Sequence, residues 1–245
     1  EFEKIISKAK KSNKKISAMI VEPIISCGGQ IELPEKFLKK CKKILERENI
    51  LLIVDEVQTG FGRVGEKFWG FQLHDVIPDI VTLGKPMGNG HPIGAVVCTA
   101  EISKKFDNGL EFFSSFGGNP VSCRIANEVI REIDSRNLQK NALKTGKFLV
   151  SELKKLAKKY SIIGNVRGRG LFIGLELVNQ NLIPEMDKAI YLVNRMKELG
   201  VLMSNDGLDK NVIKIKPPLI FSTEDSKKLL LLLEKVLKEN FMKSI

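Results

Sequence analysis

Two side chains of opposite charge, Asp55 and Lys85, stand near the ends of apolar runs that have the composition of buried strands. LLIVDEV carries the carboxylate, and DIVTLGK carries the amine. Residues that leave the carboxyl ends of neighbouring parallel strands meet over one crevice. Such strands lie about 4.8 Å apart, so both side chains could reach one ligand. The two residues therefore form either an ion pair or the polar part of a ligand site.

Glycine is dense around both side chains. Asp55 begins DEVQTGFGRVG, and Lys85 lies within LGKPMGNGHPIG. Glycine lets the backbone approach a ligand closely or adopt positive φ, at a cost in conformational entropy. A surface ion pair contributes little stability and does not require such loops. The glycines therefore favour the ligand site over the ion pair.

The elements that must position these residues alternate between strand and helix. Apolar runs predict strands at residues 16–23, 51–57, 79–85 and 94–100, with a helix after Pro34 at residues 34–48. Helices between some strands imply parallel crossovers, and continuously apolar strands are typical of a sheet covered on both faces. The first part of the chain is therefore predicted to be an α/β domain with a mostly parallel sheet.

The second part of the chain is predicted to be a smaller α+β domain. Helical patterns follow Pro120, a glycine-rich strand is expected at residues 166–177, and a last helix begins near Thr223, where Ser222 to Asp225 offer capping side chains. We place the domains at residues 1–136 and 137–245.

Composition argues against several function classes. The net charge is +11, but the lysines and arginines are spread over many helical segments and interleaved with acids, and only 7% of residues are aromatic. Nucleic-acid binders concentrate their charge on one stripe, so no nucleic-acid partner is expected. No apolar run reaches the roughly 18 residues of a membrane span. Four scattered cysteines and two histidines predict neither a metal site nor disulfides, which favours a reducing, cytoplasmic location.

Four motifs, in this order and spacing, resemble the class III aminotransferases, which are pyridoxal-phosphate enzymes of fold type I. They are DEVQTGFGRVG, PDIVTLGKPMGNGHPIGAVV, SSFGGNPVSC and VRGRGLFIGLEL. The phrases FWGFQLH and NVIKIKPPLIF are most similar to the ethanolamine-phosphate phospho-lyase branch. The resemblance covers essentially the whole chain. It implies that residues 1–136 are the C-terminal part of the cofactor-binding large domain.

The resemblance also implies roles for individual residues. Lys85 would bind pyridoxal 5'-phosphate as a Schiff base and then move a proton between substrate and cofactor. Asp55 would pair with the pyridine nitrogen, and Gln58 would reach the ring hydroxyl. Ser115 stands where the family has a residue that holds the cofactor phosphate of the neighbouring subunit, which implies a homodimer with shared sites. Glu22 lies in a family motif as well, and supports the site or caps a strand.

Three departures from the family bear on function. Many members carry an arginine for the substrate carboxylate where this chain has Lys214, and a lysine cannot make the same two-bond clamp. This fits a substrate whose anion is elsewhere, such as a phosphate. Cys27 stands where some members have a gating glutamate. Family members are longer at the N-terminus, where a glycine-serine turn binds the cofactor phosphate, so we expect the 245-residue chain alone to fold poorly and to show little activity.

Three functions follow from these observations. The first is transamination of a small primary amine. The second is elimination of phosphate and ammonia from a phosphorylated amine such as phosphoethanolamine, which would use the same Asp55, Gln58 and Lys85. The third is an inactive fragment that lacks the phosphate-binding loop. His91 is interpreted as structural, because a lone histidine is a poor basis for acid chemistry.

Overall fold

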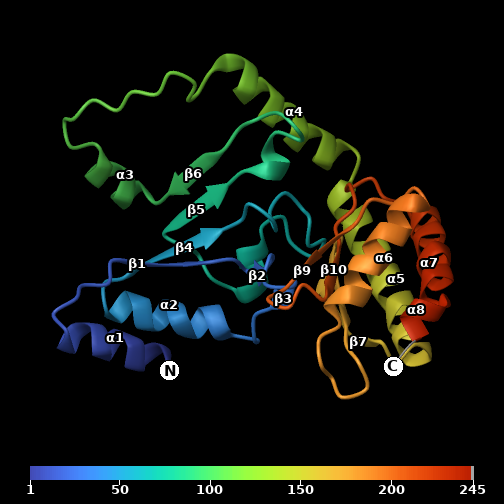
Figure 1. The fold of residues 1–245 in the computed structure, drawn as a ribbon. Helices are drawn as coiled ribbons and strands as arrows, with labels where there is room; N and C mark the ends of the chain where they lie inside the picture. Colours follow the sequence, from blue (N-terminus) through green and yellow to red (C-terminus); the bar gives the residue numbers. More distant parts are fainter. Residues whose placement is uncertain (244–245) are drawn as a thin grey trace. The chain divides into compact units, whose positions relative to one another are not determined.

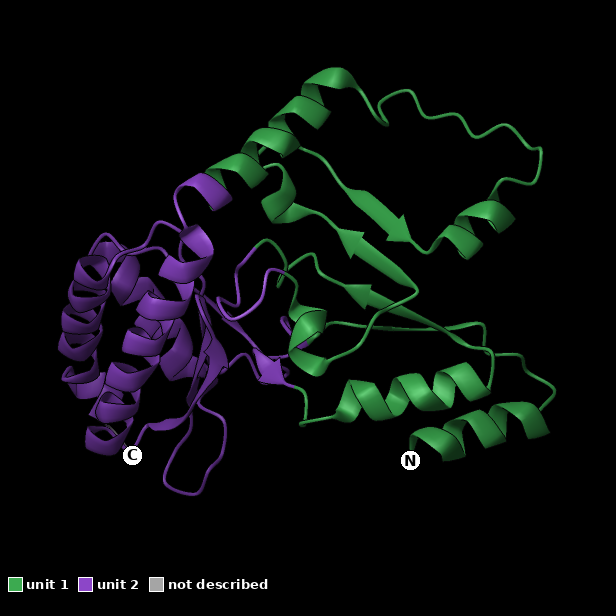
Figure 2. Ribbon diagram, turned by 180° about the vertical axis from the view of Figure 1, so that it is seen from behind, with its two compact units in different colours: residues 1–23, 33–61, 69–133 green, residues 24–32, 62–68, 134–245 purple. Residues whose placement is uncertain are grey.

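A computed structural model describes residues 1–243, and these residues form two compact units (Figures 1 and 2). Unit 1 comprises residues 1–23, 33–61 and 69–133. Unit 2 comprises residues 24–32, 62–68 and the chain from Asp134 onward. Two short segments of the first half thus pack with the C-terminal part, while the domain boundary expected after residue 136 stays a prediction.

The sheet of unit 1 has the strand order β1-β4-β5-β6. Its strands are β1 (Ala18–Val21), β4 (Leu51–Asp55), β5 (Ile80–Leu83) and β6 (Ala95–Cys98). The pairs β1–β4 and β4–β5 are parallel, whereas β6 runs antiparallel to β5. A parallel return needs a crossover of about a dozen residues or more, usually helical, and the short link between β5 and β6 holds only the turn after Lys85. The prediction of a mostly parallel sheet in an α/β fold is confirmed.

The helices of unit 1 are α1 (Phe2–Lys11), α2 (Phe37–Arg47), η1 (Gly70–His74), η2 (Lys85–Met87), α3 (Ala100–Phe106) and α4 (Pro120–Ser135). Two of them, α1 and α2, cover one face of this sheet. Leu52 and Val54 of β4 pack with Ile6 of α1 and Leu45 of α2 in one apolar cluster. The helix expected to start at Pro34 begins at Phe37 instead, and it buries Leu38, Cys41 and Leu45.

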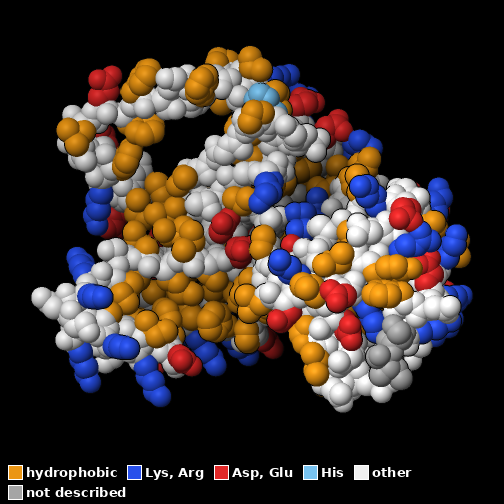
Figure 3. All heavy atoms as spheres, viewed as in Figure 1, with side chains coloured by type: hydrophobic (Ala, Val, Ile, Leu, Met, Phe, Trp, Pro, Cys, Tyr) orange, Lys and Arg blue, Asp and Glu red, His pale blue; other side chains and the backbone are white. Residues whose placement is uncertain are grey.

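The opposite face of the same sheet stays largely exposed. Ile20, Ile53 and Ile80 are register partners and point to this side, and so do Asp55, Thr82 and Val96 one pleat further on. The side chain of Ile20 is 63% exposed and that of Val96 is 68% exposed. Figure 3 shows hydrophobic side chains gathered over the strands of unit 1. Within this unit, the expectation of a sheet covered on both faces is wrong.

Unit 2 is built on an antiparallel sheet of order β7-β8-β10-β9. Its elements are β2 (Ile24–Ile25), β3 (Ile31–Glu32), α5 (Leu138–Lys159), β7 (Ile163–Arg169), β8 (Phe172–Leu177), α6 (Met186–Glu198), β9 (Ser204–Asp206), β10 (Val212–Ile215), α7 (Thr223–Leu237) and α8 (Asn240–Lys243). Leu175 of β8, Leu149 of α5, Leu192 of α6 and Leu233 of α7 are completely buried in one core. Helices therefore cover one face of this sheet.

The start of α7 is fixed by the cap that the sequence predicts. The Ser222 hydroxyl accepts a hydrogen bond from the Asp225 amide at 3.0 Å, and the Asp225 carboxylate accepts one from the Ser222 amide at 3.0 Å. This reciprocal arrangement satisfies two amides that a helix start leaves open. Among residues 1–243, no helix is both long and apolar enough to cross a membrane.

Candidate functional site

Asp55 and Lys85 lie at the same end of the sheet of unit 1. Asp55 is the last residue of β4 and is in register with Thr82 of the parallel strand β5. Lys85 follows the end of β5 and is the first residue of the short helix η2. The structure thus brings the predicted carboxylate and amine to the carboxyl ends of two neighbouring parallel strands, where α/β sheets bind ligands.

The carboxylate of Asp55 has one oxygen available for a ligand. Its Oδ1 atom accepts a hydrogen bond from the Val57 amide at 2.9 Å, which fixes the side chain over the turn that follows β4. Its Oδ2 atom has no hydrogen-bond partner in the part of the chain that the structure describes. The residue is only partly exposed. An oriented, partly desolvated carboxylate oxygen is suited to accept a hydrogen bond from a protonated ring nitrogen.

The amine of Lys85 is accessible. The side chain is exposed, and no hydrogen bond or ion pair joins it to another described residue. Pro86 follows at the start of η2, where its fixed φ is compatible with a helical turn. A lysine that is not bound to a carboxylate keeps its nitrogen available for covalent chemistry with a carbonyl group.

Thr82 lies beside Asp55 and has an unsatisfied hydroxyl. Its Oγ1 atom is buried and has no hydrogen-bond partner within residues 1–243. Buried polar atoms are nearly always paired, so an orphan next to a candidate site calls for a polar group that belongs there. Three polar groups therefore lie at one end of the sheet: a carboxylate oxygen, an amine and an unpaired hydroxyl. They suit a ligand ring that carries a nitrogen, a hydroxyl and a phosphate.

Glu56 is a residue of this region that sequence reasoning missed. Its carboxylate is completely buried and accepts hydrogen bonds from the Phe71 amide at 2.7 Å, the Gly70 amide at 2.9 Å and the Thr59 hydroxyl at 2.7 Å. Burial raises the pKa of this carboxyl, and the hydrogen bonds oppose that rise. Glu56 therefore fixes the turn after Asp55 to the start of η1. The only sequence signal was a second acid directly after the first.

The other predicted residues of unit 1 occupy three places. Gln58 lies partly buried in the turn after β4. Glu22 follows β1, the strand next to β4, and is likewise partly buried. Ser115 lies in the exposed segment between α3 and α4. The roles of these three residues stay predictions.

Lys214 belongs to unit 2 and is engaged by an acid. Its ammonium group lies 3.0 Å from Oδ1 and 2.8 Å from Oδ2 of Asp206 on the neighbouring strand β9. The fully buried Gln30 donates to the same carboxylate at 2.9 Å. Both carboxylate oxygens of Asp206 therefore lie within hydrogen-bond distance of the Lys214 amine.

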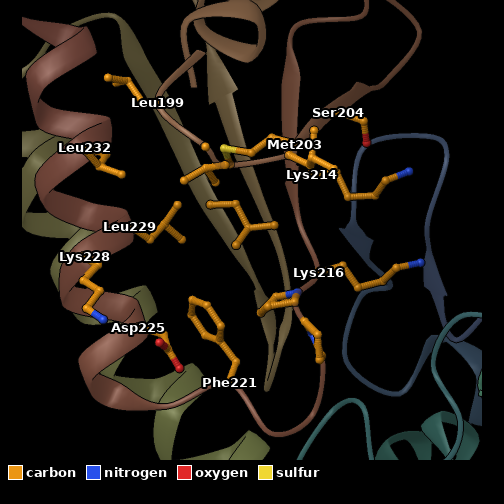
Figure 4. Close-up of a pocket in the computed structure, with 16 residues that line it drawn as sticks. Leu199, Met203, Ser204, Lys214, Lys216, Phe221, Asp225, Lys228, Leu229 and Leu232 are labelled. Carbon is orange, nitrogen blue, oxygen red and sulfur yellow. The ribbon is translucent and has the colours of Figure 1, made fainter. Parts of the chain in front are cut away.

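A cavity of about 710 Å³ lies within unit 2 and differs in character from the region around Lys85. Its walls are mostly apolar and include Met203, Phe221 and Leu229, between α7 and the strands β9 and β10 (Figure 4). Figure 4 shows the amines of Lys214 and Lys216 directed away from this apolar wall. Of the polar residues that line it, Asp225 is bound to Ser222 and Lys214 to Asp206, so the chemistry-bearing residues remain those of unit 1. No group of three or more His, Cys, Asp or Glu suited to a metal occurs in residues 1–243.

Comparison with known proteins identifies the relatives of this chain. The family model described as class-III aminotransferase matches residues 1–237. An alanine–glyoxylate aminotransferase 2-like protein of Drosophila melanogaster is 46% identical over 234 residues, which cover 94% of this chain and 47% of the relative. An ethanolamine-phosphate phospho-lyase homolog of Caenorhabditis elegans is 38% identical over 227 residues, covering 91% of this chain and 49% of the relative.

Solved structures have the same fold. A phospholyase from Arthrobacter in complex with phosphoethanolamine superposes with a TM-score of 0.92 at 39% identity, covering 95% of this chain and 56% of that one. The chain spans about half the length of the curated relatives that it matches.

Proposed function

Because the chain belongs to the class III aminotransferase family, we propose that the whole protein is a pyridoxal-phosphate enzyme acting on a small primary amine. One observation carries this proposal. Asp55 and Lys85 lie at the same end of neighbouring parallel strands, one with an available carboxylate oxygen and the other with an available amine. An acid for the ring nitrogen and an amine for the aldehyde are the two groups that this cofactor requires.

The residues of this chain would divide the work as follows. Lys85 would hold the cofactor covalently through its ε-amino group and would move a proton to and from the carbon that bears the substrate amine. Asp55, whose carboxylate is held by the Val57 amide, would accept a hydrogen bond from the protonated ring nitrogen. Gln58 would reach the ring hydroxyl. When bound, the cofactor supplies the electron sink that makes loss of the substrate proton possible.

Ser115 supports a shared site. It lies in a segment whose side chains are almost all exposed, including Phe112 at 74% and Phe116 at 85%. Exposed aromatic side chains of this kind are enriched at protein interfaces. We propose a homodimer in which Ser115 binds the cofactor phosphate of the neighbouring subunit. Location in the cytoplasm stays a prediction.

Transamination is the main reading of the reaction, and phosphate elimination is the second candidate. Both use Lys85 and Asp55, and they diverge after the substrate proton is removed. The aminotransferase relative supports the first, and the phospholyase structure supports the second. The engagement of Lys214 by Asp206 also favours the second, because it weakens Lys214 as a carboxylate receptor. Lys214 and Glu22 remain weaker candidates for contacts with substrate.

Visible absorption tests the cofactor site. The whole protein is expected to show the band of a lysine-bound cofactor, and Lys85→Ala is expected to lose that band and to lower kcat by about 10²-fold to 10⁴-fold. The exposed Lys104 on α3 offers a matched control, and Lys104→Ala should retain both. A wild-type spectrum that Lys85→Ala does not change would end the proposal.

Product analysis separates the reactions. Phosphate released from phosphoethanolamine identifies a phospho-lyase, whereas alanine formed from an amino donor and pyruvate identifies an aminotransferase. The 245-residue chain, assayed beside the whole protein, tests the third reading, that this piece alone is inactive. Turnover by the 245-residue chain would contradict that reading.

A further inference from the structure

The turn after Lys85 is tightly constrained. The His91 amide donates a hydrogen bond to the Gly88 carbonyl at 3.0 Å. A Cβ atom at Gly88 would lie 2.0 Å from the His91 carbonyl oxygen, so only glycine fits there. The turn thereby sets the place of the His91 side chain relative to the helix η2 on which Lys85 lies.

The ring of His91 makes one hydrogen bond, to α4. Its Nε2 atom lies 2.8 Å from the hydroxyl oxygen of Ser122. Ser122 is in the first turn of α4 and is 8% exposed. A partly buried hydrogen bond of this kind is less exposed to water than a surface one and stabilises the geometry of both partners.

Asn119 extends this link back to the segment that carries Ser115. Its Oδ1 atom accepts a hydrogen bond from the Ser122 amide at 2.9 Å, which caps α4. Its Nδ2 atom donates to the Ser122 hydroxyl at 2.8 Å and to the Phe116 carbonyl at 2.8 Å. One amide side chain thus joins the helix start to the residue that follows Ser115.

The segment itself is closed by a further bond. The Gly117 amide donates to the Ser114 hydroxyl at 3.0 Å, so Ser115 lies inside a small turn. A continuous path of hydrogen bonds then runs from this turn through Asn119 and Ser122 to His91.

The donors and acceptors of this path can all be satisfied at once. The Ser122 oxygen accepts from Asn119 Nδ2, and its own proton points to His91 Nε2. In that arrangement the Nε2 atom of His91 is the acceptor of the pair. The imidazole acts as an acceptor that orients the serine, and it needs no contact with substrate.

We propose that His91 is a positioning residue that holds Ser115 in place for the cofactor phosphate. The inference rests on the proposed function, in which Ser115 serves the neighbouring subunit. Within one subunit, His91 then connects the turn beside Lys85 to Ser115. That Ser115 in turn contacts the cofactor phosphate in the active site of the partner subunit. Removal of the imidazole loosens the Ser115 turn and leaves Asp55 and Lys85 unchanged.

The test compares binding of pyridoxal 5'-phosphate and of pyridoxal, which lacks the phosphate, to the whole protein. His91→Ala is expected to weaken binding of the phosphate form about tenfold, as loss of one hydrogen bond to a charged group does, and to change pyridoxal binding less than about twofold. Ser115→Ala should have the same effect. The double variant should bind the phosphate form only slightly more weakly than either single variant, because both substitutions disrupt the same phosphate contact.

Two further variants guard against general damage. His91→Gln can accept a hydrogen bond from Ser122 and should recover most of the phosphate preference, while Ser122→Ala should lose it as His91→Ala does. Equal weakening of both ligands by His91→Ala, or additive losses in the double variant, would overturn the inference. A wild-type protein that binds neither ligand would instead overturn the proposed function, and the inference with it.

Discussion

The two units cover their sheets in different ways. In unit 2, helices bury one face, and the other carries charged side chains such as Arg167, Glu176 and Lys214. In unit 1, helices also bury one face, but the other is apolar, with Ile20 and Val96 exposed. Antiparallel sheets tolerate one solvated face, whereas parallel sheets are buried on both. Unit 2 therefore buries the apolar face of its sheet with its own residues. Unit 1, which holds the candidate site, leaves one apolar face of its sheet exposed.

The largest loss of stability is expected in the closed core of unit 2. Leu233 of α7 is completely buried, whereas Leu231 on the same helix is 70% exposed. Leu233→Ala should lower the free energy of unfolding by about 3 kcal/mol, and Leu231→Ala by less than about 0.5 kcal/mol. Urea unfolding of the whole protein, followed by circular dichroism, measures both. Equal losses would contradict a closed core.

A buried carboxylate gives the next largest effect, in unit 1. Glu56→Ala leaves the donors of Thr59, Gly70 and Phe71 without their partner and should cost about 2 kcal/mol in the same unfolding measurement. Glu56→Gln supplies one acceptor oxygen instead of two and should fall between alanine and wild type. A glutamine variant as stable as the wild type would show that the stability provided by these hydrogen bonds does not depend on the negative charge of Glu56.

The pH dependence of unit 2 gives a smaller effect. Hydrogen bonds from Lys159 and Tyr160 lower the pKa of Glu234 to about 2. A depressed folded-state pKa contributes stability above the ordinary value near 4.5, and this stability is lost as pH falls toward 2. The difference in Tm between wild type and Glu234→Gln should be constant at neutral pH, shrink as pH falls below about 4.5 and vanish below about pH 2. A difference that persists there would exclude this carboxyl as its source.

The smallest effect on stability is expected at the open face of unit 1. Val96→Thr replaces one methyl group of an exposed side chain with a hydroxyl, so the free energy of unfolding should change by less than about 0.5 kcal/mol. Self-association of the 245-residue chain, measured by sedimentation, should decrease because the exposed apolar area decreases. A large loss of stability in the 245-residue chain would show that this face is packed after all.

The sequence predicted the parts of the fold that depend on local pattern. Apolar runs identified β4 and β5, and the placement of Asp55 and Lys85 at their ends followed from chain order. The reversal of β6 was not predicted, because strand direction depends on what the connection can span rather than on strand composition. The open face was not predicted either, because an apolar run has the same pattern whether or not another layer covers it.

Side chains whose roles depend on distant partners escaped prediction. Glu56 accepts hydrogen bonds from the amides of Gly70 and Phe71, and the sequence around Glu56 does not predict these partners. The hydrogen bond between His91 and Ser122 likewise joins segments that only the tertiary structure brings together. Residue type and motif predict the roles of some side chains. They do not predict roles that depend on partners distant in the sequence.

One close approach in unit 2 has a practical consequence. A Cβ atom at Gly146 of α5 would lie 2.0 Å from the Gly170 carbonyl oxygen, so helix and turn touch backbone to backbone. Further along α5, the side chains of Lys154, Lys155 and Lys158 are exposed. Fluorescent labels or surface tethers attached at these lysines would leave the fold undisturbed, whereas even one added methyl group at position 146 would force the helix off its sheet.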